Sequence, residues 1–194
     1  STHPLDQFYL ELTYGCNTRL ADMEMKASDL NQEVTFGGLI TSYEEKEARS
    51  GNKYGKIVIE DYTGKYDLML FGNNYIEYNK FGIKGLAIMV KGVFRKGRFN
   101  DRISFNIASI TPLDEVKGKL LSNLTIQVPE DRFADLSPLK ETMTESTENR
   151  CNLNFRIFTN DRKHYVDMRS QYKIPINKQV LKKLESMEME FSIN

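Results

Sequence analysis

The sequence has few of the residues on which metal sites, disulfide scaffolds and many active sites depend. It contains two cysteines, Cys16 and Cys151, and two histidines, His3 and His164. The cysteines lie far apart and have no His or Cys at metal-ligand spacing, so we expect two buried thiols in a reducing compartment and no metal. The histidines stand on separate segments without a neighbouring nucleophile in a recognised setting. We therefore expect no catalytic residues and no cofactor in this chain.

Long hydrophobic runs are also missing. The longest, such as Leu86–Val90, fall far short of the roughly 20 residues that a membrane-spanning helix needs. The first residues, STHPLDQF, have neither the basic leader nor the apolar stretch of a secretory signal. These features predict a cytoplasmic protein without a membrane partner.

A surplus of one charge sign is absent from the chain as a whole. It has 27 Lys and Arg against 27 Asp and Glu, and a pI of about 6.7. The stretch from Glu33 to Leu113 is mildly basic, with 12 cations against 9 acids, whereas residues 1–32 have 2 against 5. Dedicated nucleic-acid binders usually show a clustered basic face and a high pI, so charge gives a nucleic-acid surface only weak support.

Five β-segments with apolar/polar alternation and turn signals fill the middle of the chain, and a helix-compatible stretch, Asn73–Gly82, interrupts them. This pattern predicts a small closed barrel of the OB-fold type. The segments are Val34–Tyr43, Tyr54–Asp61, Lys65–Phe71, Leu86–Arg95 and Arg102–Pro112.

The flanking sequence predicts two further regions. Leu5, Phe8 and Leu12 form a helical stripe before a polar linker, with little to pack on, as though the sequence began mid-protein. After Pro112 the order β-α-β-β-α-β can form a ferredoxin-like sheet. Its elements are strands at 120–129, 152–160 and 163–175, a helical stripe of Phe133, Leu136, Leu139 and Met143, a helix at 178–187 capped by Asn177, and a short last strand. The expected division is 1–32 (helix end and linker), 33–113 (OB-fold, mainly β) and 114–194 (α+β).

The binding surface of an OB barrel consists of the outer face of its second and third strands and two loops. Alternation points Ile57, Ile59, Tyr66, Leu68 and Leu70 inward. Cations interleaved with aromatic side chains suit a single strand, because cations neutralise phosphates and aromatic rings stack on bases. A solvated hairpin tip at 95–102, and Met69 and Phe71 covering the barrel against a neighbouring domain, are the structural alternatives. The candidate nucleic-acid-binding residues are Lys53, Tyr54, Lys56, Lys65, Met69, Phe71, Arg95, Lys96, Arg98, Phe99 and Arg102.

Three motifs favour structural roles. Asp61, in IEDYTG, is better explained by a turn between two strands than by metal binding or acid-base chemistry. Gly37 and Gly38 lie inside a strand, so they relieve crowding in the barrel and do not form a phosphate-binding loop. The acidic cluster of Glu44, Glu45 and Glu47 predicts a solvated loop.

Several of these features occur together in one known family. They are the Gly-(Leu/Ile)-Ile/Val-Thr pattern of the first strand, the loop Gly-Lys, the Glu-Asp-x-Thr-Gly turn, a third strand ending in Phe, and the upstream His3-Pro4-Leu5-Asp6. Most of residues 3–113 thereby resembles the OB domain near the C-terminus of the bacterial replicative DNA polymerase III alpha subunit.

The resemblance implies a catalytically inert C-terminal fragment of a DNA-directed DNA polymerase, a nucleotidyltransferase whose catalytic carboxylates, PHP domain and clamp-binding motif would precede Ser1. The barrel would bind single-stranded DNA template, and the domain after Asp114 would dock the clamp-loader tau subunit and other replisome subunits. Family members often have a more basic first loop and an aromatic residue where Lys56 stands, so weaker template binding is expected here.

Other functions remain open on the sequence. Both domains could be purely protein-interaction modules, which the near-neutral charge favours. The barrel could also be an anticodon-binding OB domain of an aminoacyl-tRNA synthetase, which the HPLD segment disfavours. An independent enzyme is the least favoured.

Overall fold

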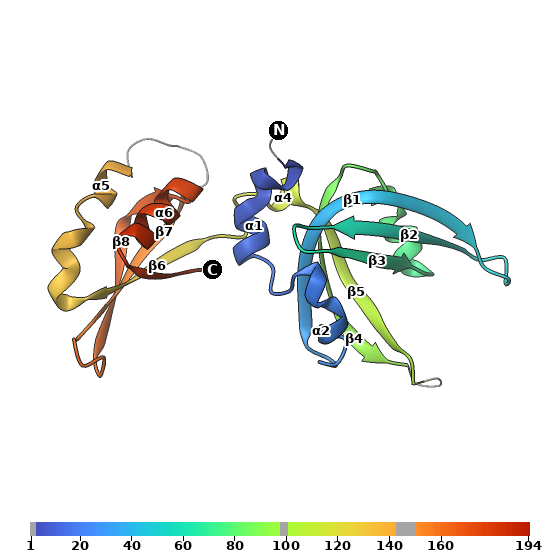
Figure 1. Ribbon diagram of the computed structural model, residues 1–194, viewed down its shortest axis with the longest axis horizontal. Coiled ribbons are helices and arrows are strands. Elements are labelled where there is room, and N and C mark those ends of the chain that lie inside the picture. The colour runs from blue at the N-terminus through green and yellow to red at the C-terminus, as the bar shows by residue number, and fades with distance from the viewer. Residues whose placement is uncertain (1–2, 98–100, 143–149) are drawn as a thin grey trace. The chain divides into compact units, whose positions relative to one another are not determined.

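The computed structural model describes residues 3–97, 101–142 and 150–194 (Figure 1). The chain divides into two compact units, Ser1–Lys117 and Gly118–Asn194. Within the described residues, no helix is long and apolar enough to cross a membrane.

The first unit is built around a five-stranded antiparallel sheet. Its strands are β1 (Glu33–Glu47), β2 (Lys53–Glu60), β3 (Lys65–Leu70), β4 (Ala87–Lys96) and β5 (Ile103–Pro112), in the order β3-β2-β1-β4-β5. The helix α3 (Asn73–Tyr78) and a 3-10 turn, η3 (Asn79–Phe81), connect β3 to β4, and α4 (Leu113–Val116) follows β5. The five predicted strands and the inserted helix are therefore confirmed.

The predicted register is confirmed as well. Ile57, Ile59 and Leu70 are completely buried, Leu68 is 1% exposed, and Tyr66 is half-buried against the same core. Lys56 pairs with Met69 across the β2–β3 ladder, which places both on the outer face. Because the period of a strand is two, this register fixes every outward side chain on β2 and β3.

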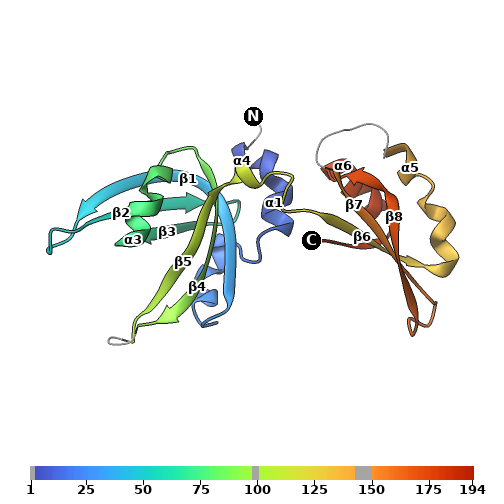
Figure 2. The ribbon, with the colours of Figure 1, turned by 180° about the vertical axis from the view of Figure 1, so that it is seen from behind.

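The barrel is closed by side chains instead of by a continuous ladder. Within the described part of the chain, β3 and β5 are the two edges of the sheet and share no ladder. Tyr66 of β3 and Phe105 of β5 approach to 6.3 Å between ring centroids, and both contact Phe36 at 5.6 Å. The buried Tyr78 of α3 donates a hydrogen bond to the Ala108 carbonyl at 3.4 Å. Figure 2 shows the helix α3 together with the strands of this unit. The expectation of a closed barrel is corrected to this extent: aromatic rings occupy the gap between β3 and β5, where a fifth ladder would close the sheet.

The N-terminal segment packs on the barrel. It forms η1 (Pro4–Phe8), α1 (Tyr9–Tyr14), η2 (Leu20–Asp22) and α2 (Met23–Lys26). Leu5, Phe8, Leu20 and Met23 are buried, and Leu20 and Met23 belong to the barrel core itself. The expectation that this segment has little to pack on is wrong, because its side chains pack on β1 and in the barrel core. A Cβ at Gly37 would lie 2.7 Å from Leu12 Cδ2, so the missing side chain admits α1.

The second unit is a four-stranded mixed sheet with helical segments. Its elements are β6 (Asn123–Pro129), η4 (Glu130–Leu136), α5 (Leu139–Thr142), β7 (Arg150–Phe158), β8 (Tyr165–Pro175), α6 (Lys178–Ser186) and β9 (Glu190–Ile193). Leu124, Ile126, Leu153, Val180 and Leu184 form its buried core. Asn177 Oδ1 accepts a hydrogen bond from Val180 N at 2.9 Å, the predicted cap of α6.

The order of elements in this unit agrees with the prediction, but a ferredoxin-like arrangement is not observed. The strand order is β8-β7-β6-β9, and β6 and β7 are direct parallel neighbours. A split βαβ unit would place β8 between them. Most side chains of β8, including Asp167, Arg169 and Tyr172, are exposed, which suits an edge strand and not a central one.

Candidate nucleic-acid interface

The turn between β2 and β3 is built by Asp61. Its Oδ1 accepts hydrogen bonds from the backbone N–H groups of Thr63 (2.7 Å) and Gly64 (2.9 Å), and its Oδ2 accepts one from Leu20 N (2.9 Å). Thr63 Oγ1 in turn accepts a hydrogen bond from Ala21 N at 3.2 Å. The turn interpretation of Asp61 is confirmed, and the same carboxylate fastens the N-terminal segment to the barrel.

The HPLD segment reaches the same turn. His3 caps η1 by accepting a hydrogen bond from Leu5 N at 3.2 Å, and its ring lies 4.8 Å from that of Tyr62. Tyr62 donates its hydroxyl hydrogen to Asp6 Oδ1 at 2.7 Å, and burial together with this bond raises the pKa of Tyr62 to about 12. Two motifs far apart in the sequence therefore contact each other and hold β2 and β3 in place.

An aromatic pair lies at the other end of β2 and β3. The rings of Tyr54 and Phe71 are 5.2 Å apart between centroids and inclined by 31°. Phe71 is 57% exposed, and Tyr54 is half-buried. Both belong to the outer face defined by Lys56 and Met69, of which Met69 is half-buried. A tilted, accessible pair of rings offers a stacking surface for a planar base.

A hollow of about 470 Å³ adjoins this pair. The β1–β2 loop forms one wall and the start of α3 forms another, with Tyr75 and the 74% exposed Ile76. Sequence reasoning did not select these two residues, because their place at the hollow comes from the neighbouring β1–β2 loop and not from the pattern of their own helix. The hollow is lined by Ala48, Ser50, Asn52, Lys53, Tyr54, Phe71, Gly72, Tyr75 and Ile76.

Each lysine proposed on β2 and β3 has a carboxylate partner. Lys56 Nζ lies 2.7 Å from Asp67, and Lys65 Nζ lies 3.0 Å from Glu60. Lys53 Nζ is 2.7 Å from Glu45, and the hydrogen bond between them raises the pKa of Lys53 and lowers the pKa of Glu45. These three pairs leave the outer face without a net charge.

The acidic cluster is part of β1 and not a loop. Glu44, Glu45 and Glu47 extend the strand past Tyr43, because they pair with Lys56, Gly55 and Lys53 of β2. Glu44 also contacts Lys46 at 2.8 Å, a hydrogen-bonded pair that lowers the pKa of Glu44. The solvated-loop expectation is corrected: the side chains are exposed, but the backbone is a β-ladder.

The ends of β4 and β5 supply the remaining cations. Arg95 and Arg102 are exposed, and Arg95 has no ion pair with any described residue. Lys96 lies 2.9 Å from Asp101. Arg98 and Phe99 lie outside the described residues. The structure thus brings Lys53, Tyr54 and Phe71 together around one hollow. The ends of β4 and β5 lie apart from the β1–β2 loop on the same unit (Figure 1).

The chain matches a family model and several known proteins. Residues 34–113 match a family model described as an OB-fold nucleic acid binding domain. The DNA polymerase III subunit alpha of Pasteurella multocida is 27% identical over 133 residues, and that of Haemophilus influenzae 25% over the same length. The resemblance to the DNA polymerase III alpha subunit is confirmed. Each match includes 69% of this chain but only 11% of the length of the alpha subunit.

A third alpha subunit, from Borreliella burgdorferi, is 25% identical over 154 residues, which is 77% of this chain and 13% of that protein. Among solved structures, the mitochondrial single-stranded DNA binding protein Rim1 of S. cerevisiae matches 42% of this chain and 95% of its own, at 22% identity and a TM-score of 0.33. RecG bound to a three-way DNA junction matches 43% of this chain and 12% of its own, at 23% identity and a TM-score of 0.32. At these TM-scores the structural likeness does not decide a function.

Proposed function

We propose that the first unit binds single-stranded DNA as a non-catalytic part of a replicative DNA polymerase, and that the second unit docks the clamp-loader tau subunit. The similarity to alpha subunits supports the replicative setting. The observation that carries DNA binding is the pair formed by the half-buried Tyr54 and the exposed Phe71 beside its hollow, on the face that OB folds use for oligonucleotides.

Stacking is the main source of affinity in this proposal. Lys53, Lys56 and Lys65 are each within 3.0 Å of a carboxylate, so a phosphate must compete with a pairing already made. Arg95 is free of such a partner among the described residues and can meet a phosphate directly. The single strand therefore places its bases on Tyr54 and Phe71, and its backbone contacts few cations.

Replacing the aromatic pair tests this proposal. Stacking on an aromatic side chain contributes about 1–3 kcal/mol per base, so Tyr54→Ser combined with Phe71→Ser is expected to weaken oligo-dT binding at least tenfold. Tyr165→Ser removes a 61% exposed tyrosine from the second unit and is the matched control. Fluorescence anisotropy measures both.

Neutralising Arg95, Lys96 and Arg98 together tests whether the β4–β5 loop contacts the phosphates. If this triple variant binds oligo-dT as tightly as the unchanged protein, the loop is not part of the interface. Equal affinities for the aromatic double variant, the control and the unchanged protein would contradict stacking. The alternative function, a purely protein-interaction barrel, draws on the neutral outer face. It would be favoured if the unchanged protein bound oligo-dT no better than an unrelated neutral protein does.

A further inference from the structure

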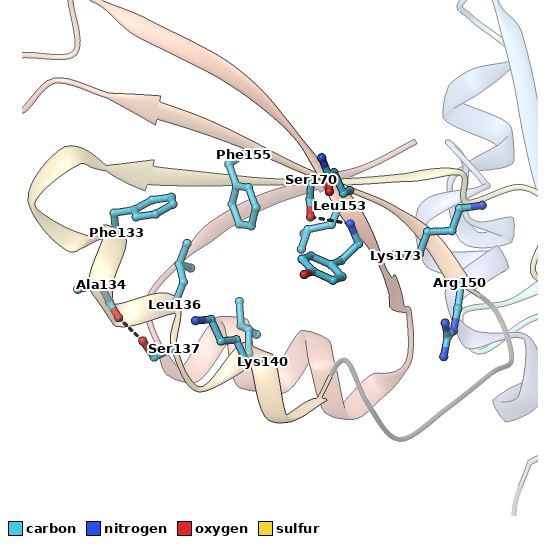
Figure 3. Close-up of a pocket in the computed structure, with 13 residues that line it drawn as sticks. Phe133, Ala134, Leu136, Ser137, Lys140, Arg150, Leu153, Phe155, Ser170 and Lys173 are labelled. Carbon is cyan, nitrogen blue, oxygen red and sulfur yellow. Dashed lines mark hydrogen bonds between the residues drawn. The ribbon is translucent and has the colours of Figure 1, made fainter.

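The second unit contains a cavity with a volume of about 950 Å³ (Figure 3). It lies between η4 and α5 on one side and β7 and β8 on the other. The connection from β6 to β7 contains a four-residue α-helix and a 3-10 segment, whereas β8 leads into the nine-residue α6. The described part of this connection leaves the cavity between its helical segments and the strands β7 and β8.

The floor of the cavity is apolar. Leu136, Leu139 and Leu153 are at least 92% buried there, and Phe133 and Phe155 make an edge-to-face contact at 6.1 Å between centroids. Phe133 is nevertheless 44% exposed. The apolar surface continues past the cavity, since Met168, the ladder partner of Phe155, is 43% exposed, and Val166 is 62% exposed. An elongated apolar surface of this kind fits a chain segment better than a compact small molecule.

The charged residues among the described lining of the cavity are all of one sign. Lys140, Arg150 and Lys173 line it, and no Asp or Glu is among its described lining residues. Lys140 and Lys173 have no ion pair with any described residue. This differs from the outer face of the barrel, where each lysine has a carboxylate beside it. Positive charges around an apolar floor select a partner that carries carboxylates next to apolar side chains.

The ladder is irregular at the same place. Pairing passes from Asn152–Lys173 to Asn154–Arg169, so Ser170, Gln171 and Tyr172 together oppose Leu153. All three line the cavity, and Tyr172 is 72% exposed. Extra residues of this kind bend a strand and re-aim its side chains, and they occur often next to binding sites.

We propose that this cavity binds a short acidic segment of a partner protein, which inserts apolar side chains between η4 and β7 and pairs its carboxylates with Lys140 and Lys173. The proposal rests on, and deepens, the docking role given above to the second unit. It does not depend on DNA binding by the barrel.

The test uses the full chain and a fluorescein-labelled twelve-residue peptide with the sequence Asp-Glu-Phe-Asp-Glu-Leu repeated twice. One comparison peptide has Lys at every acidic position, and another has Ser at every apolar position. We expect the acidic apolar peptide to bind at least tenfold more tightly than either. Lys140→Glu combined with Lys173→Glu should reduce its affinity at least tenfold, whereas Lys182→Glu, an exposed lysine of α6 outside the cavity, should not.

Equal binding of the acidic and basic peptides, or no binding of the acidic one, would overturn the proposal, as would an equal loss in the Lys182→Glu variant. Oligo-dT binding by the double variant is measured in parallel and should be unchanged, which separates this site from the barrel. Peptide binding without binding of a purified tau subunit would refute the named partner and leave the site standing.

Discussion

Two adjacent glycines of β1 show how single residues determine this fold. Gly37 and Gly38 point to opposite sides of the strand, and neither position has room for a side chain. At Gly37 the nearest atom to an added Cβ is the tip of Leu12, whereas at Gly38 it is the Glu60 carbonyl oxygen at 2.6 Å. The sequence predicted that these glycines relieve crowding. The structure adds that Gly37 leaves room for Leu12 of the N-terminal segment, and that Gly38 leaves room for Glu60 at the end of β2.

Substitution by alanine should separate these two roles. At Gly38 the obstacle is backbone, which cannot move aside, so Gly38→Ala is expected to destabilise the first unit by about 1–3 kcal/mol. Gly37→Ala should cost less, because the Leu12 side chain can shift. Urea unfolding of both variants measures this difference, and an equal or smaller cost for Gly38→Ala would contradict it.

The half-buried Cys16 and the buried Cys151 should ionise at a higher pH in the folded chain than in the unfolded chain. Burial, helped by Asp61, raises the pKa of Cys16 from 9.0 to about 12, and burial raises the pKa of Cys151 to about 11. Unfolded thiols therefore ionise first as the pH rises, and stability should fall progressively above pH 9. Native protein at pH 8 should also react slowly with iodoacetamide, and quickly in urea. A native thiol that reacts at pH 8 as fast as free cysteine would refute this.

At the scale of elements, the β2–β3 turn is the point where the N-terminal segment and the barrel are joined. Asp61 contacts Leu20 N, while Asp6 accepts the Tyr62 hydroxyl. The sequence offered both motifs, HPLD and EDYTG, but nothing in their spacing of more than 50 residues shows that they meet. That contact needs tertiary structure, which is why the segment before β1 was expected to be a linker.

Asp61→Ala should loosen this junction. It removes the acceptor of the turn and leaves Leu20 N without its partner, which is expected to cost about 1–3 kcal/mol. Asp61→Asn retains one carbonyl oxygen and should cost less. Glu24→Ala, an exposed acidic residue of the same segment, is the control. Chemical denaturation measures all three, and equal stabilities of Asp61→Ala and Glu24→Ala would contradict the assignment.

Alternation and turn signals were sufficient to place the strands of the barrel, because each strand has one buried face. They did not place the end of β1, since Glu44 to Glu47 have exposed side chains and their pairing with β2 has no apolar signature. Nor could they order the second sheet, because a hairpin can lie inside or outside a βαβ unit with the same sequence of elements. Tyr75 and Ile76 were missed since their role comes from the neighbouring loop and not from their own helix.

At the scale of the whole molecule, the two units differ in how their charged side chains are paired, although the net charge of the chain is zero. The chain is neutral, yet Lys53, Lys56 and Lys65 of the barrel are each matched with a carboxylate, while the charged residues among the described lining of the second unit's cavity are all cations. A neutral face with exposed rings suits bases, and a cationic apolar cavity suits an acidic segment. The two proposed functions therefore use different interactions in different units.

The most direct test of the central claim compares a labelled oligo-dT with a duplex of equal length by fluorescence anisotropy at low and near-physiological salt. We expect preference for the single strand and a shallow salt dependence, because Lys53, Lys56 and Lys65 are already paired with carboxylates and few phosphates are neutralised. Each neutralised phosphate changes the logarithm of the binding constant by only about −0.7 for a tenfold rise in salt concentration. Equal or tighter binding of the duplex, or no binding of oligo-dT at low salt, would contradict single-strand binding by this barrel.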